Sequence, residues 1–298
     1  MASELSSGNI DHKTENTSDD EKPVSMKLAR ELYYQGDKEA AIAAFKEKAD
    51  RYNAGKRKVL PKLAAVRAGV DFWDLRVSHK HKIAFSLIQK NACTSLSYAI
   101  YLAETGEDLS HFPDQHIHTY YQKMGVVTSL EPFEDYFKFA VIRDPIKRFI
   151  SAFRNRALFH LDLEEMENPR GDLITEPDIN YFIEKLDDYL ARSQKLEMHT
   201  IPQCVYLNRR LDQMDAIYPI EEMSKLEEKL TEIIGEPFSL PRRQTGGPKI
   251  SLADLTSASF EKLLSFYAED YAFLSDYYSE AAIRREYETA ISSQAKTT

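Results

Sequence analysis

The period of the apolar positions changes along the chain, and this pattern predicts strands that alternate with helices. Short apolar, β-compatible runs occupy residues 81–89, 136–144 and 215–220. Each run precedes a segment with helical spacing of apolar residues, at 95–106, 145–159 and 221–235. Strands that alternate with helices are typical of a parallel sheet covered on both faces. The pattern therefore predicts an α/β fold.

Residues at the predicted helix ends support these assignments. Asp144 followed by Pro145 is a favourable N-cap and first-turn pair, and Gly235 is a favourable C-cap. In the helix predicted at 145–159, one face carries Ile146, Phe149, Ile150 and Phe153. A last helical, aromatic-rich segment, residues 257–278, is expected to pack against the sheet.

The segment before the first strand is predicted to form a helical hairpin. Residues 26–52 read as two amphipathic helices that are interrupted at Gly36 and Asp37. The segment resembles one tetratricopeptide unit, and such units stabilise one another by stacking. Two interpretations stay open: a hairpin packed on the main domain, and a module that binds a protein partner.

Composition predicts one large domain with short flanking segments. The 298 residues include 43% hydrophobic positions, enough to bury a full core. Residues 1–23 are polar and are expected to be disordered, whereas 24–58 hold the hairpin. Residues 59–285 form the main domain, and 286–298 form a C-terminal tail whose last residues, 291–298, we expect to fray.

Charge and cysteine usage narrow the functional classes. The net charge of −9 disfavours a surface for nucleic acid, so any anion site must be local. Neither a membrane-spanning apolar stretch nor a signal peptide is recognisable, so a cytoplasmic protein is expected. The two cysteines, Cys93 and Cys204, are too few for a disulfide scaffold and lack paired metal-ligand spacing.

A first candidate site is the segment LIQKNACTSL, which joins a predicted strand to a predicted helix. It carries Lys90, Asn91, Thr94 and Ser95 where the helix begins. Unpaired N–H groups and a partial positive charge at a helix N-terminus favour a phosphate or phosphosulfate group. The glycines of the GxxxxGK[ST] motif are absent, which disfavours an ATPase or kinase of that class. Taken alone, the segment also fits a helix cap beside a solvated lysine.

A second strand-to-helix junction, IRDPIKRFISAFRNR, adds a possible partner for the first. Arg143 stands at the strand end and Ser151 lies two helical turns later. Both loops should open at the carboxyl edge of the sheet, where open α/β folds bind ligands. A guanidinium group and a hydroxyl suit a phosphate. At least two of Arg148, Arg154 and Arg156 are expected to solvate an exposed helix face.

These two motifs together resemble a known family. LIQKNACTSL is similar to the 5'-phosphosulfate-binding loop of the membrane-type carbohydrate sulfotransferases, and VIRDPIKRFISAFRNR resembles their 3'-phosphate-binding motif. The resemblance covers roughly residues 75–278 and includes HTIPQCVYL at 199–207. It implies a P-loop-like parallel sheet flanked by helices, and transfer of a sulfuryl group from 3'-phosphoadenosine-5'-phosphosulfate (PAPS). The product would be adenosine 3',5'-bisphosphate.

The resemblance also implies roles for particular residues. Lys90 would approach the phosphosulfate group, and Arg143 and Ser151 would hold the 3'-phosphate. The 5'-phosphate would be held by Asn91, Ala92, Cys93, Thr94 and Ser95. A loop at 240–251 would close over the cofactor, with Arg242, Arg243 and Lys249 as weaker candidates. Sulfuryl transfer needs an in-line donor and acceptor, positive charge at the leaving oxygen and a base for the attacking hydroxyl; it does not require a metal.

Two departures from the family pattern stand out. Gln89 stands where most relatives have proline, which affects the backbone path of the first loop rather than its chemistry. The amino-terminal membrane anchor that is usual in animal members is not recognisable, which favours a bacterial or cytosolic enzyme.

The candidate catalytic base lies in DQHIHTYYQ, residues 114–122, between the two motifs. Imidazole titrates near neutral pH, and His116 and His118 would point to the same side of an extended segment. Heparan-type 2-O-sulfotransferases resemble this region, and the second histidine of their pair is thought to act as the base. We therefore favour His118, with His116 as an orienting neighbour. A hydrogen-bonded surface patch is the alternative; His79, His81 and His199 are less attractive.

Two other functions stay open at this point. Cys93 at a helix N-terminus would fit a cysteine hydrolase. A noncatalytic module that binds a nucleotide or a partner on a sulfotransferase-like scaffold is the second alternative. For a sulfotransferase, the expected acceptor is a hydroxyl of a carbohydrate or glycan, whose identity the sequence does not reveal.

Overall fold

A computed structural model describes residues 68–69, 71–108, 117–118, 121, 127–164, 166, 171–241 and 248–295. All of these residues belong to one compact unit, Ala49–Thr298. The segment 1–23 and the hairpin 24–58 lie outside the described residues. In the part of the chain that the structure describes, no helix combines the length and the apolar character needed to cross a membrane.

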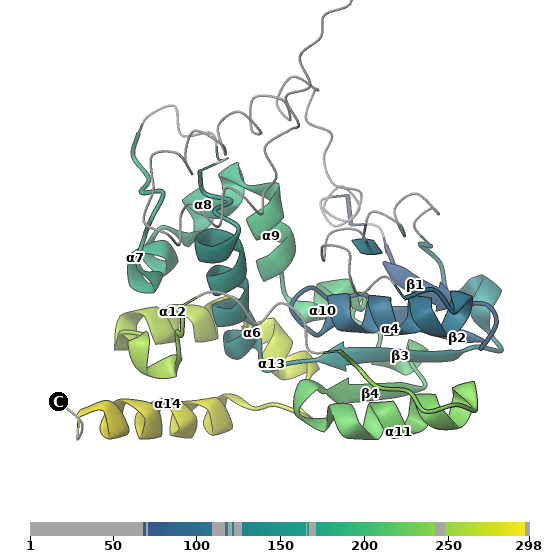
Figure 1. Ribbon diagram of the computed structural model, residues 1–298. Coiled ribbons are helices and arrows are strands. Elements are labelled where there is room, and N and C mark those ends of the chain that lie inside the picture. Colours follow the sequence, from purple (N-terminus) through teal and green to yellow (C-terminus); the bar gives the residue numbers. More distant parts are fainter. Residues whose placement is uncertain are drawn as a thin grey trace, which may run out of the picture. The chain divides into compact units, whose positions relative to one another are not determined.

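The described residues form a mixed, mostly parallel sheet of four strands in the order β1-β2-β3-β4 (Figure 1). The strands are β1 (Leu75–Ser78), β2 (Ile83–Ser86), β3 (Phe137–Ile142) and β4 (Ala216–Pro219). β3 pairs in parallel with both β2 and β4, whereas β1 is antiparallel to β2. The sequence pattern predicts β2, β3 and β4 and their parallel direction, and the structure confirms them.

Strand β1 is the element that the sequence pattern misses. It has only four residues and contains Arg76, so its alternation is too short to recognise. Arg76 is nevertheless only 5% exposed, and its Nη1 lies 2.5 Å from Asp74 Oδ1. Because that ion pair compensates the buried charge, the arginine is compatible with a strand position. The sequence pattern predicts a parallel sheet, and the antiparallel strand β1 makes it a mixed one.

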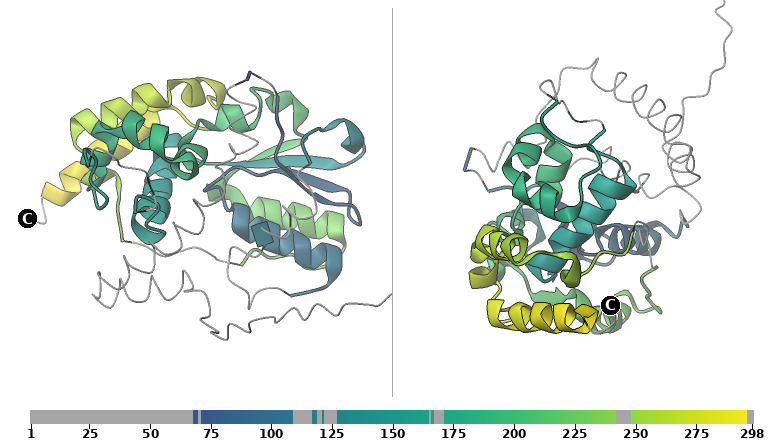
Figure 2. Two further views of the ribbon diagram at one scale, coloured as in Figure 1. Left: turned by 90° about the horizontal axis from the view of Figure 1, so that it is seen from above. Right: turned by 90° about the vertical axis from the view of Figure 1, so that its left-hand side faces the viewer.

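Helices cover both faces of β3. Phe139 and Val141 contact α4 (Cys93–Thr105) and α11 (Met223–Ile234), which lie on the same side of the sheet (Figure 2, left). Ala140 and Ile142 face the opposite core, to which α10 (Gln203–Tyr206) contributes. A strand that is buried on both faces reads as a continuous apolar run, as FKFAVI does.

A further core, the helical core, is built almost entirely from helices. It contains residues from α6 (Pro145–Ala152), its π-helical continuation Phe153–Phe159, α7 (Ile179–Glu184), α8 (Leu186–Arg192), α9 (Gln194–Thr200), α12 (Ser257–Phe266), α13 (Ala268–Phe273) and α14 (Glu280–Ala295). The expectation that residues 257–278 pack against the sheet is wrong for most of this segment. Phe260, Leu263 and Tyr267 join the helical core, because α10 and Leu274 already occupy the adjacent sheet face.

The predicted features of α6 and α11 are confirmed. The side chain of Asp144 accepts a hydrogen bond from Lys147 N at 3.0 Å, as an N-cap does. The four apolar residues of the predicted helix face are all buried: Ile146, Phe149, Ile150 and Phe153. Gly235, with φ of 80°, ends α11 in the left-handed conformation.

The carboxyl-terminal helix α14 extends across the boundary expected at residue 285. Residues 286–295, assigned from sequence to the C-terminal tail, are helical. Tyr287 is 8% exposed, its ring stacks on Phe260 at 4.1 Å, and its hydroxyl donates to Leu255 O at 3.0 Å. These contacts anchor α14 to the helical core.

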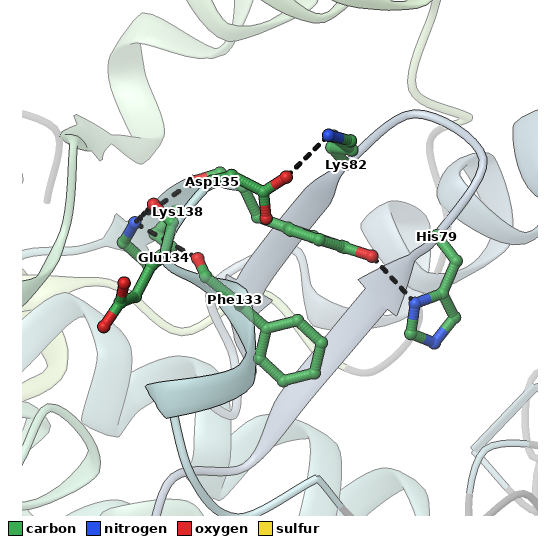
Figure 3. Close-up of polar contacts among 7 residues, drawn as sticks. His79, Lys82, Phe133, Glu134, Asp135 and Lys138 are labelled. Atoms are coloured by element: carbon green, nitrogen blue, oxygen red, sulfur yellow. Dashed lines mark hydrogen bonds and ion pairs between the residues drawn. The ribbon is translucent and has the colours of Figure 1, made fainter.

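The amino-terminal edge of β2 and β3 is held by polar contacts (Figure 3). Lys82 Nζ lies 2.5 Å from Asp135 Oδ2, and His79 Nδ1 lies 3.0 Å from the Tyr136 hydroxyl. Lys138 Nζ donates to the backbone oxygens of Phe133, Glu134 and Tyr136. His79 is therefore engaged at the edge opposite to the two loops of interest.

Candidate functional site

Two loops meet at the carboxyl ends of β2 and β3, where they border one cavity of about 610 Å³. One loop runs from β2 into α4, and the other runs from β3 into α6. The cavity brings together seven of the residues singled out from sequence: Lys90, Ala92, Cys93, Thr94, Ser95, Arg143 and Ser151. The remaining wall comes from α11, the turn before it and the segment that follows it.

The backbone of the first loop forms an anion cradle without glycine. Lys90 and Ala92 adopt φ of 71° and 56°, in the left-handed region. Left-handed residues that alternate with right-handed ones turn successive N–H groups toward one concavity. The N–H groups in the first turn of an α-helix have no intrahelical partner, and α4 begins at Cys93 without a side-chain cap to satisfy them. These donors and the helix dipole favour a bound anion.

Positive charge is concentrated around Lys90. Burial, the largest cause, and the charges of Arg156, Arg143 and Arg154 together lower the pKa of Lys90 to about 7, against an opposing effect of Cys93. Arg143 Nη1 also donates to the Lys90 carbonyl oxygen at 3.4 Å. A cluster of cations that disfavours its own protonation is well suited to receive an anionic ligand.

A second cavity of about 340 Å³ adjoins the first. Arg143 and Ser151 line both cavities. Lys147 and Arg154 of the second cavity add positive charge, while Glu286 of α14 pairs with Lys147 at 2.7 Å. Arg143 and Ser151 therefore stand at the junction of two hollows, where a phosphate could contact both side chains.

A comparison with protein families shows to which family the chain that carries this site belongs. A model described as the sulfotransferase family matches residues 73–278. The chain belongs to the sulfotransferase family. No curated protein and no solved structure matches the chain. The matched region of this sulfotransferase includes both loops, whereas α14 lies beyond it.

The candidate base His118 lies beside the first loop of the sulfotransferase. Its Nε2 is 2.9 Å from the hydroxyl oxygen of Thr94, a residue that lines the cavity. His116 lies outside the described residues, as do Arg242 and Arg243. Lys249 is described, and it is exposed.

Asn91 has a different place from its neighbours in the first loop. It is 2% exposed, and its Nδ2 donates to Val141 O at 2.9 Å and to Gln203 Oε1 at 2.6 Å. The side chain thus attaches the loop to β3 and α10. The family resemblance groups Asn91 with residues that contact phosphate; in the structure its amide holds the loop.

The expectation that at least two of Arg148, Arg154 and Arg156 solvate an exposed helix face is wrong. Arg148 is fully buried; its Nε donates to Gln89 O at 3.0 Å, and its guanidinium lies over the Tyr206 ring. Arg156 Nε pairs with the buried Asp162 at 2.5 Å. Arg154 lines the second cavity. Neighbouring helices and loops cover this face, which helical periodicity alone does not reveal.

His199 is a further histidine near the cationic cluster. Burial, followed by the charges of Arg156 and Lys90, lowers its pKa well below the ordinary value. Its Nδ1 lies 2.6 Å from Lys195 O, so Nδ1 carries the proton and the ring is neutral. His199 is less attractive than His118 as a catalytic base from the sequence, and its contact with Lys195 lies within its own helix, α9.

The structure gives little support to a cysteine hydrolase. The Cys93 thiol donates to Gln89 Oε1 at 3.6 Å and lies 4.0 Å from Thr94 Oγ1. Among the described residues, the histidine beside this loop contacts Thr94 instead. No group of three or more His, Cys, Asp or Glu side chains in the described ranges could hold a metal ion.

The depressed pKa of Lys90 predicts proton uptake when an anion binds. At pH 8 Lys90 is mostly neutral, because its pKa is about 7. A bound phosphate favours the ammonium form and raises that pKa, so binding takes up a proton and affinity falls as the pH rises above 7. Calorimetry at pH 8 in buffers of different ionisation enthalpy measures the uptake.

The matched control for this prediction is Lys90→Arg, which keeps a positive charge that does not titrate in this range. It should bind adenosine 3',5'-bisphosphate without proton uptake. Equal uptake by the wild type and Lys90→Arg would assign the proton to another group.

Proposed function

We propose that this sulfotransferase transfers a sulfuryl group from PAPS to a hydroxyl of a carbohydrate or glycan by in-line displacement. The observation that carries the proposal is the single cavity lined by Lys90, the first turn of α4, Arg143 and Ser151. Both ends of a nucleotide with two anionic groups would find donors there. A cluster of cations with a depressed lysine pKa fits such a ligand.

The cavity wall suggests how the chain would hold the nucleotide. The N–H groups at the start of α4 would bind the 5'-phosphate, and Arg143 and Ser151 would bind the 3'-phosphate. The adenine ring of the nucleotide would lie against an apolar part of the wall, formed by Ile220, Met223, Leu240 and Pro241. Glu227 accepts a hydrogen bond from Leu240 N at 2.7 Å and so fixes this wall relative to α11.

The chain's own residues supply charge and proton transfer. PAPS, when bound, supplies the sulfuryl group, which leaves its bridging oxygen as the acceptor oxygen bonds to sulfur. The Lys90 ammonium would stabilise the negative charge that develops on the bridging oxygen. His118 would take the proton of the acceptor hydroxyl, and His116 is the neighbouring candidate. Atoms balance: the acceptor gains the sulfuryl group and loses one proton to the base.

Acceptor, location and partner are further parts of the proposal. Basic residues near both loops suit an anionic glycan, although the chain as a whole has a net charge of −9. We propose a cytoplasmic location, and a protein partner for the hairpin at 24–58. Nucleic acid is not proposed as a ligand, because the excess charge has the wrong sign.

The acceptor is identified by incubation of the purified protein with sulfur-labelled PAPS and a panel of glycans, glycolipids and small alcohols. The proposal expects label on a sugar hydroxyl, and the reaction should be lost in Arg143→Gln. Label on a small alcohol or a lipid hydroxyl alone would replace the carbohydrate by that class.

A further inference from the structure

Gln203, at the start of α10, joins the two loops of the site through one buried side chain. The residue is 0% exposed. Its Nε2 donates to Arg143 O at 2.7 Å, and its Oε1 accepts from Arg143 N at 3.0 Å. The same Oε1 accepts from Asn91 Nδ2 at 2.6 Å. One amide therefore holds the backbone of the second loop and a side chain of the first.

Gln203 is itself held from behind by a buried carboxylate. The backbone N–H groups of Gln203 and Cys204 each donate to Asp270 at 2.8 Å. Asp270 belongs to α13 and is 0% exposed. Hydrogen bonds in such a buried network polarise one another, and leaving one member unpaired is costly. Gln203 thus provides a rigid point between the loops.

Two additional contacts tie the loops together. Asn91 Nδ2 donates to Val141 O at 2.9 Å, next to the end of β3. Arg143 Nη1 reaches Lys90 O at 3.4 Å. The separation between the α4 N-terminus and Arg143 is therefore set by bonds within the protein. Gln203 is the member of this set that contacts both loops and a third element.

We infer that Gln203 is a positioning residue that couples the two phosphate subsites, and that this coupling selects a nucleotide with two phosphates over either monophosphate. The inference rests on the proposed function. When the separation of the subsites is preset, the second phosphate binds without the cost of ordering its loop. Without Gln203, each loop still binds one phosphate, but the two are no longer held in register.

The test is a calorimetric comparison of four ligands: adenosine, its 5'-monophosphate, its 3'-monophosphate and its 3',5'-bisphosphate. These four affinities give the coupling factor, which is the factor by which one phosphate strengthens the binding of the other. Gln203→Met should lower this factor about 10-fold, within the usual range of coupling between sites. Both monophosphates should bind almost as they do to the wild type.

Gln203→Glu is the second variant, in case the methionine variant does not fold. It has nearly the same size and keeps the acceptors for Asn91 and Arg143 N, but it replaces the Nε2 donor by an oxygen facing Arg143 O. It should also lower the coupling. The matched control is Tyr189→Phe, which removes the hydroxyl of another buried side chain, in α8, and its hydrogen bond to Ile174 O at 2.6 Å. Its coupling factor should equal that of the wild type.

Several outcomes would overturn the inference. One is an unchanged coupling factor in a folded Gln203 variant. Another is a variant that loses affinity for the 3'-monophosphate by the same factor as for the bisphosphate, because Gln203 would then only support Arg143. If neither variant folds, hydrogen exchange of the wild type decides. The 5'-monophosphate should slow exchange of Arg143 N–H, and no slowing overturns the coupling. A wild type that does not prefer the bisphosphate would instead contradict the proposed function.

Discussion

Lys90→Ala lowers kcat by about 10²- to 10³-fold, the range found when one preorganised donor to developing charge is removed. The nucleotide affinity should fall much less. The reason is that the bridging oxygen gains its charge only as the bond to sulfur breaks, so the ammonium group contributes more in the transition state than in the bound ground state. Single-turnover rates measured with saturating donor separate this effect from binding.

The control for Lys90 is Lys225→Ala, which removes an exposed lysine that pairs with Glu222 on the solvent side of α11. Its kcat should match that of the wild type. Normal turnover by Lys90→Ala would show that the Lys90 ammonium has no part in the reaction.

His118→Ala should lower turnover by about 10²-fold or more, as expected for loss of a general base. A sugar hydroxyl is a poor nucleophile until its proton is being removed, and the His118 ring lies 2.9 Å from Thr94 Oγ1 at the start of α4. Affinity for adenosine 3',5'-bisphosphate should be nearly unchanged. Calorimetry is done first, so that a damaged loop is not mistaken for a missing base.

His79→Ala is the matched control, because that histidine contacts Tyr136 at the opposite edge of the sheet. It should retain wild-type turnover. Near-normal turnover by His118→Ala would contradict the assignment of the base and move it to His116 or Asp114.

The sequence pattern predicts those parts of the fold that depend on long, regular runs. The apolar run FKFAVI marks β3, and Asp144, Pro145 and Gly235 mark helix ends because caps are local chemistry. β1 escapes prediction because it is short and carries a buried arginine whose partner is not recognisable from periodicity. The packing of residues 257–278 depends on which surface remains uncovered, which is a tertiary property.

The residues of the candidate site are likewise predictable from sequence only in part. Lys90 and Arg143 are recognisable because each stands in a strand-to-helix loop with its own motif. Gln203 and the true environment of Arg148 are not recognisable, because their partners are far away in the chain: Asn91 and Gln203 are 112 residues apart. The depressed pKa of Lys90 likewise arises first from burial and then from nearby arginines, and both depend on the tertiary fold.

The central claim is that one cavity binds a nucleotide by both of its phosphates, and a calorimetric titration of the wild type tests it most directly. Arg143 and Ser151 would each donate to the 3'-phosphate, and hydrogen bonds to charged groups contribute enough for about 10²-fold in affinity. Adenosine 3',5'-bisphosphate should therefore bind about 10²-fold more tightly than adenosine 5'-monophosphate. Equal affinity for the two nucleotides would contradict the account.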